Sequence, residues 1–176
     1  METVAASLRI ERVVMVAAVV LACALALPAA TQERDGQNWP SFRGPNASGV
    51  ADVQSLPTVW DSRTSVNMPW KTSIPGLAHS SPIVWGSRVF LTTAISSEPK
   101  PEFSPKAVGP GMARDRVKHT WKIYCLDKST GAVIWDRTAH EGIPRAGRHI
   151  KATQASSTPV TDGRRVVADR LLSIST

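Results

Sequence analysis

The sequence predicts an all-β fold built from short antiparallel hairpins. Runs of alternating or β-branched residues are separated by turns that draw on 11 glycines and 13 prolines. Residues 121–135 have the pattern of a complete hairpin. Residues 82–89 and 159–166 align with each other without a gap, at an offset of 77 positions (82 to 159). A repeated hairpin indicates a fold assembled from similar sheets.

The hairpin at residues 121–135 has the clearest signature. Residues 121–126 predict its first strand and residues 132–135 its second. In the turn between them, the carboxylate of Asp127 can accept backbone N–H groups two residues on, and Gly131 supplies the positive φ that closes the turn. Because both strands are largely apolar on both faces, we expect their sheet to lie between two neighbouring layers.

The remaining elements follow in chain order. Residues 56–60 and 69–74 are short strand candidates, and residues 80–84 and 88–93 form the next predicted pair. Residues 94–117 are rich in proline and glycine and are predicted to be a surface insertion loop. Residues 138–153 predict a second long loop. Residues 157–161 and 165–168 repeat the earlier strand pair.

The first 30 residues resemble a secretory signal peptide. Two arginines flank a polar start, residues 13–27 are apolar and uncharged, and small residues follow at 28–30. The apolar run of 15 residues is shorter than the roughly 20 that span a bilayer. We therefore expect an exported chain with no membrane span after cleavage. An uncleaved anchor, or lipidation at Cys23, are the alternatives.

Charge and cysteine content restrict the function classes. The formal net charge is +7, but the basic residues are scattered and no helical or aromatic-interleaved basic run occurs, so nucleic acid is not the expected partner. After cleavage only Cys125 remains, which excludes an internal disulfide. We expect Cys125 to be a small buried hydrophobe in a strand.

The hairpin turn resembles the repeat signature of the pyrroloquinoline-quinone-like, or quinoprotein-like, β-propellers. That signature is a small residue, any residue, Asp, two residues, Thr-Gly, three residues and Trp. Asp127, Thr130, Gly131 and Trp135 match it, and Cys125 replaces the usual alanine. Segments 38–45, 80–84 and 156–160 resemble the same family, so the resemblance covers residues 38–168. It is closest to secreted bacterial members related to the outer-membrane assembly lipoprotein, whose propellers bind no quinone.

The resemblance implies an incomplete propeller over residues 31–176, about one four-stranded blade with flanking strands. It also implies that a tryptophan docks on the Thr-Gly turn of a neighbouring blade, and that residues 69–74 pair with C-terminal strands. The implied function is a non-catalytic protein-interaction or scaffolding module of the cell envelope, periplasmic or extracellular. Other envelope proteins are the expected partners, and open sheet edges could support association.

Two other functions remain open at this stage. A fragment of a quinone-dependent dehydrogenase would need calcium and the quinone, but the chain has no adjacent cysteines, haem motif, zinc spacing or Gly-x-Ser-x-Gly elbow. We therefore assign no catalytic, cofactor-binding or metal residue. The second alternative function is none at all, for a truncated product. Residues 169–176 depart from the repeat pattern, which predicts a shortened or frameshifted chain. A short protein that completes its sheets by assembly is the alternative.

One loop is a candidate ligand site. Arg148, His149 and Lys151 lie close together in sequence, with His140 and Arg145 nearby. This concentration of positive charge could meet a carboxylate or phosphate. The alternative is a solvated connecting loop. For Asp127, a structural role as a turn cap is favoured over catalysis.

Overall fold

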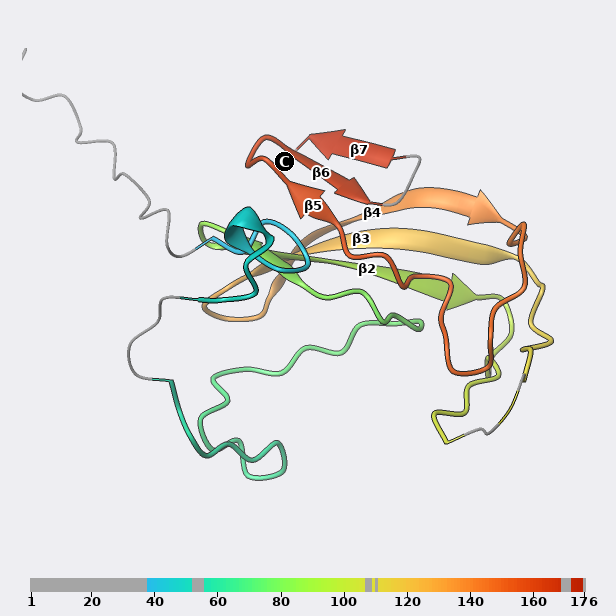
Figure 1. Ribbon diagram of the computed structural model, residues 1–176, viewed down its shortest axis with the longest axis horizontal. Helices are drawn as coiled ribbons and strands as arrows, with labels where there is room; N and C mark the ends of the chain where they lie inside the picture. The colour runs from blue at the N-terminus through green and yellow to red at the C-terminus, as the bar shows by residue number, and fades with distance from the viewer. Residues whose placement is uncertain (1–37, 52–55, 107–108, 110, 169–171, 176) are drawn as a thin grey trace, which may run out of the picture. The chain divides into compact units, whose positions relative to one another are not determined.

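The computed structural model describes residues 38–51, 56–106, 109, 111–168 and 172–175, which all belong to one compact unit over residues 34–176. Within these residues the chain forms seven strands in two antiparallel sheets and one short 3-10 helix, Pro45–Ala47 (Figure 1). The predicted all-β class is confirmed. The predicted signal peptide at residues 1–30 lies outside the described residues. No helix in the described part is long and apolar enough to cross a membrane.

The first sheet has four strands in chain order, β1-β2-β3-β4. They are β1 (Ile83–Trp85), β2 (Arg88–Ser96), β3 (His119–Asp127) and β4 (Val133–Gly142). The predicted strand pairs are confirmed, but β2, β3 and β4 are longer than predicted, whereas β1 is shorter and begins at Ile83 rather than at residue 80. Ala94 to Ser96 pair with Trp121 to His119, so the insertion loop begins at residue 97 rather than 94. The next loop likewise begins after Gly142 rather than at 138.

The second sheet has the order β5-β6-β7. Its strands are β5 (Val160–Thr161), β6 (Arg165–Ala168) and β7 (Leu172–Ser175). Val160 lies opposite Val167 as Ile83 lies opposite Phe90, which confirms the internal repeat at the same offset. That residues 169–176 depart from the repeat and mark a shortened or frameshifted chain stays a prediction. Beyond residue 168, β7 pairs with β6. Its alternating Leu-Ser-Ile-Ser sequence has the two-residue period of a strand.

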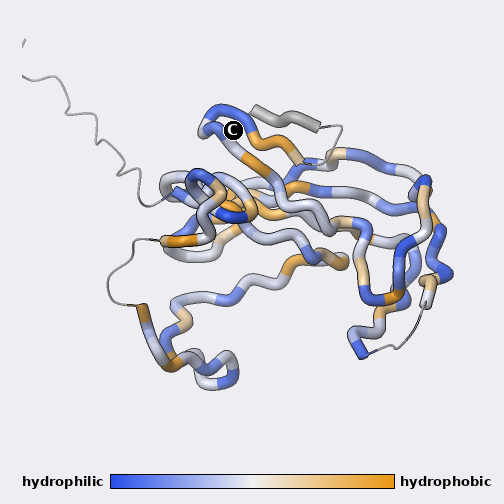
Figure 2. The backbone as a smooth tube through the Cα atoms, in the orientation of Figure 1, coloured by the Kyte–Doolittle hydropathy of each residue, from blue (hydrophilic) through white to orange (hydrophobic). Residues whose placement is uncertain are grey.

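The two sheets share one hydrophobic core. Its buried members are Ile83, Phe90, Ile123 and Cys125 from the first sheet and Val166 and Ala168 from the second. Figure 2 shows the hydrophobic segments of β5 and β6 that belong to this part of the fold. Because successive residues of a strand point to opposite faces, Val167 lies on the outer face of the second sheet and is 41% exposed. Cys125 is confirmed as a buried free thiol, whose pKa is raised by burial.

Strand β4 is the exposed edge of the first sheet. Val133 and Ile134 are 44% and 50% exposed, so the expectation of apolar layers on both faces holds for β3 but is wrong for β4. The β3–β4 register shifts twice, between Trp121 and Lys122 and between Cys125 and Leu126. Such bulges twist a strand and disfavour edge-to-edge pairing.

The opposite edge, β1, is covered by the N-terminal segment. The backbone N–H of Trp39 donates to Val84 at 2.8 Å, and the N–H of Val84 donates back at 2.9 Å. The next residue, Pro40, accepts from the N–H of Thr161 in β5 at 3.0 Å. This short segment therefore connects the edges of both sheets.

The predicted strands at 56–60 and 69–74 do not form. Residues 69–74 are extended, with half-buried Trp70, Thr72 and Ile74 alternating with exposed residues, yet no described strand pairs with them. Proline at positions 69 and 75 removes backbone donors that a ladder would use. The segment packs against the first sheet instead, since the Thr93 hydroxyl donates to the carbonyl of Pro75 at 2.7 Å.

The face-to-face packing makes a prediction about two adjacent valines. Val166→Ala should lower the free energy of unfolding by about 2 kcal/mol, because it removes buried methyl groups from the shared core. Val167→Ala, on the exposed face, should change it by no more than about 0.5 kcal/mol. Urea unfolding of the two variants measures both values. Equal losses of unfolding free energy in the two variants would contradict the packing of β6 through the face that carries Val166.

Candidate functional site

The turn between β3 and β4 is organised by one carboxylate. Asp127 accepts backbone N–H groups from Ser129 and Thr130, each at 2.9 Å, and the hydroxyls of the same two residues. These hydrogen bonds, that of the Ser129 hydroxyl first, lower the pKa of Asp127 to about 2. Gly131 has φ of 72° and donates its N–H to the carbonyl of Asp127. The predicted turn geometry is confirmed, and Asp127 has all of these bonds within the turn.

This turn is also a docking site for a tryptophan. The indole N–H of Trp70 donates to the carbonyl of Lys128 at 2.9 Å, and the Thr72 hydroxyl donates to the carbonyl of Gly131 at 2.6 Å. A Cβ atom on Gly131 would lie 2.4 Å from the Trp70 ring. Only glycine therefore permits both the positive φ and the approach of the indole.

A second tryptophan docks on a glycine turn of the second sheet. A Cβ atom on Gly163 would lie 2.4 Å from the Trp85 ring, and Gly163 has φ of 84°. Asp162 accepts the backbone N–H groups of Arg164 and Arg165 in that turn. The same combination of acidic cap, glycine and tryptophan thus occurs in both sheets.

Trp135, the last residue of the sequence signature, has different neighbours in the described residues. Its ring lies 6.0 Å from that of Phe90, and the guanidinium of Arg137 lies 5.8 Å from its centroid. Sequence reasoning identified the accepting turn but missed Trp70 and Trp85 as the docked rings. Their signal is tertiary, because each ring meets a glycine far away in sequence.

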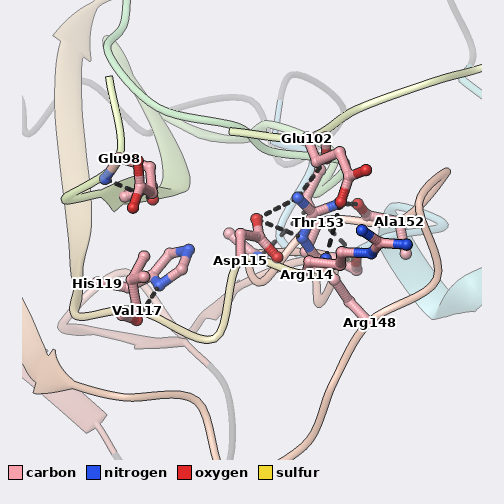
Figure 3. Close-up of polar contacts among 12 residues, drawn as sticks. Glu98, Glu102, Arg114, Asp115, Val117, His119, Arg148, Ala152 and Thr153 are labelled. Carbon is pink, nitrogen blue, oxygen red and sulfur yellow. Dashed lines mark hydrogen bonds and ion pairs between the residues drawn. The ribbon is translucent and has the colours of Figure 1, made fainter. Parts of the chain in front are cut away.

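The candidate ligand loop contains a buried ion pair. The Arg148 guanidinium pairs with Asp115, and the two side chains are 4% and 6% exposed (Figure 3). It also donates to the carbonyls of Ala152, at 2.7 Å, and Glu102. Every guanidinium nitrogen of Arg148 therefore already donates within the protein. Arg148 joins the two long loops, and sequence reasoning missed its partner Asp115.

The other two predicted residues of this loop have separate surroundings. A ring nitrogen of His149 lies 3.1 Å from the carbonyl of Gly109, and the other accepts the backbone N–H of Lys151. Lys151 itself is exposed. With Arg148 bonded inside the loops, these three residues do not gather their charges at one position. Binding of an anion by this trio stays a prediction.

The described residues contain no group of three or more metal-ligating side chains. Every fully buried side-chain nitrogen or oxygen in this part has a hydrogen-bond partner. No family model, curated protein or solved structure matches the chain.

Tryptophan docking makes Gly131 sensitive to substitution. Gly131→Ala should cost about 3 kcal/mol of unfolding free energy, because it combines positive-φ strain with displacement of Trp70. Gly109→Ala is a matched control, since Gly109 also has positive φ but its Cβ atom would meet nothing within 4 Å. The control should cost only about 1 kcal/mol. Denaturant unfolding that gives equal costs for the two variants would argue against the docking.

The Asp127 turn predicts a dependence of stability on acid. The pKa of Asp127 is about 2, below its ordinary 3.8, so the charged form is favoured by folding. Its stabilising contribution is complete above about pH 5 and is lost as the pH falls toward 2. The stability difference between the native chain and Asp127→Asn should therefore shrink between about pH 5 and pH 2. Denaturant unfolding of both chains across this pH range measures the stability difference. A difference that stays constant with pH would disprove the prediction.

Proposed function

We propose that the chain is a non-catalytic, extracytoplasmic part of a quinoprotein-like β-propeller and acts as a protein-interaction or scaffolding module. The observation that carries this proposal is the repeated unit. A hairpin recurs at the same register in two sheets, and in each sheet a tryptophan docks on a glycine turn. Stacked sheets with conserved geometry between repeats are typical of propellers.

The two sheets differ in what covers them. Ile83 and Phe90 of the first sheet are 0% and 1% exposed beneath the second sheet. Val160 and Val167 occupy the equivalent positions in the second sheet and are 45% and 41% exposed. The same apolar pair is thus buried in the first repeat and exposed to solvent in the second. This difference favours a further layer of protein on the outer face of the second sheet.

The surroundings of the reactive side chains favour binding over catalysis. Asp127 and Asp162 accept backbone N–H groups in turns, and Asp115 neutralises a buried arginine. The Cys125 thiol is buried in the core, where a raised pKa keeps it protonated. By contrast, apolar and cationic side chains are exposed to potential partners. The pattern of residues 1–30 supports export of the chain.

Cofactor binding and cell fractionation test this function. The purified chain, mixed with calcium and pyrroloquinoline quinone, should acquire no bound chromophore and should reduce no dye with alcohols or sugars. In cells, a tagged chain should be recovered in the periplasmic or extracellular fraction. A stoichiometric quinone complex with dehydrogenase activity would contradict the non-catalytic function. Retention in the cytosol would contradict export.

The open valine pair predicts self-association of the isolated chain. Sedimentation velocity should show a concentration-dependent shift to larger species, because exposed apolar sheet surface promotes association. Val160→Asp should reduce this shift at least several-fold. Val133→Asp, at a similarly exposed valine of β4, is the matched control and should leave the shift unchanged. A chain that stays monomeric at every concentration, or equal effects of the two variants, would refute this prediction.

A further inference from the structure

The two long loops meet in an irregular antiparallel ribbon of residues 111–116 and 145–150, here called the loop ribbon. Met112 lies opposite His149, the N–H of Ala113 donates to Arg148 at 3.0 Å, and the N–H of Ile150 donates to Gly111 at 2.8 Å. Beyond these backbone bonds, the Arg116 side chain contacts the facing segment, since its guanidinium donates to the carbonyl of Arg145 at 3.5 Å. Residues from two loops are thus held side by side.

The two faces of the loop ribbon differ in charge and burial. Ala113 and Asp115 are buried, whereas Met112, Arg114 and Arg116 alternate with them and are exposed. The buried side holds the ion pair between Asp115 and Arg148. The exposed side carries Arg114 and Arg116, and the Glu102 carboxylate lies there too, where it accepts the backbone N–H of Arg114 at 2.8 Å.

Within the described residues, Arg114, Arg116 and Arg145 form no ion pair, although ion pairs do form at four other places. The Arg116 guanidinium donates to the carbonyl of Arg145 at 3.5 Å, so these two residues are neighbours. A guanidinium has five N–H donors, so Arg116 retains donors for a carboxylate of a partner.

We propose that the exposed side of the loop ribbon binds an acidic peptide segment of a partner protein. The guanidinium groups of Arg114, Arg116 and Arg145 take its carboxylates, which match their planar donors in bidentate geometry. Met112, 59% exposed, contacts an apolar residue beside the acidic ones. This inference rests on the proposed interaction function and names the surface and the partner chemistry.

The chemistry of the loop ribbon favours a peptide over other polyanions. Single-stranded nucleic acid is bound on aromatic platforms, and residues 111–116 and 145–150 contain no Phe, Tyr or Trp. Membrane-surface elements combine basic residues with Trp, Phe or Leu along one apolar face, which this segment lacks. The Asp115–Arg148 pair and its carbonyl contacts hold the ribbon in shape before binding, and this lowers the entropic cost of binding.

The first test uses short poly-L-glutamate as the probe. Fluorescence anisotropy at low salt should show binding to the full exported chain that weakens as salt is added. Arg116→Glu combined with Arg145→Glu should weaken binding at least tenfold. Arg43→Glu combined with Arg63→Glu changes the net charge equally at two exposed positions outside the ribbon, and should have less than a threefold effect. Equal losses in the two double variants would overturn the proposal.

Two further measurements make the test specific. Arg116→Gln combined with Arg145→Gln, a milder change, should weaken binding in the same direction, and unaltered binding would overturn the proposal even if the Glu variant failed to fold. Inorganic phosphate, a DNA oligomer and anionic lipid vesicles should bind more weakly than poly-L-glutamate, and tighter binding of any of them would overturn the peptide assignment. Loss of poly-L-glutamate binding would not alter the results of the quinone-binding and self-association experiments. The peptide-binding proposal and the proposed function can therefore fail separately.

Discussion

The packing of Val166 and Ala168 against the first sheet is the contact on which the rest of the structure depends. It covers Phe90, Ile123 and Cys125, which otherwise would form an open apolar face on a single sheet. A lone sheet with one apolar face cannot bury it without another layer. This contact buries the Cys125 thiol between the two sheets. It also places Val167 on the outer face of the second sheet, where it is exposed.

Two tryptophans secure the turns around this core. Trp70 docks on Gly131 from an extended segment, and Trp85 extends from β1 to Gly163 in the second sheet. Each indole needs a glycine with positive φ, so the turn sequence and the docking are coupled requirements. The long loops use a different device, the buried Asp115–Arg148 pair, which fixes their shape and leaves their cationic side in solvent. The fold thus combines a rigid apolar centre with an ordered charged periphery.

Local features could be predicted from the sequence, and tertiary ones could not. Alternation predicted β3, and β-branched and aromatic content predicted β2. The internal repeat predicted β6, and the Asp127 to Gly131 chemistry predicted the turn. The exposure of β4 could not be read from its apolar residues, because the sequence does not state which strand lies at an edge. Residues 69–74 have a strand pattern but no described partner strand. Arg148 looked like a ligand residue because its neutralising Asp115 is 33 positions away.

The most direct test of the central packing is the reactivity of Cys125 toward a thiol reagent. In the chain with Cys23→Ser, Cys125 is the one thiol, and it is 0% exposed at the contact between the sheets. Labelling in native buffer should be slow and should follow the rate at which the chain unfolds. Val166→Asp, which places a charge in the contact, should make labelling much faster. Rapid labelling of the chain with an intact Val166 would contradict the face-to-face packing of the two sheets.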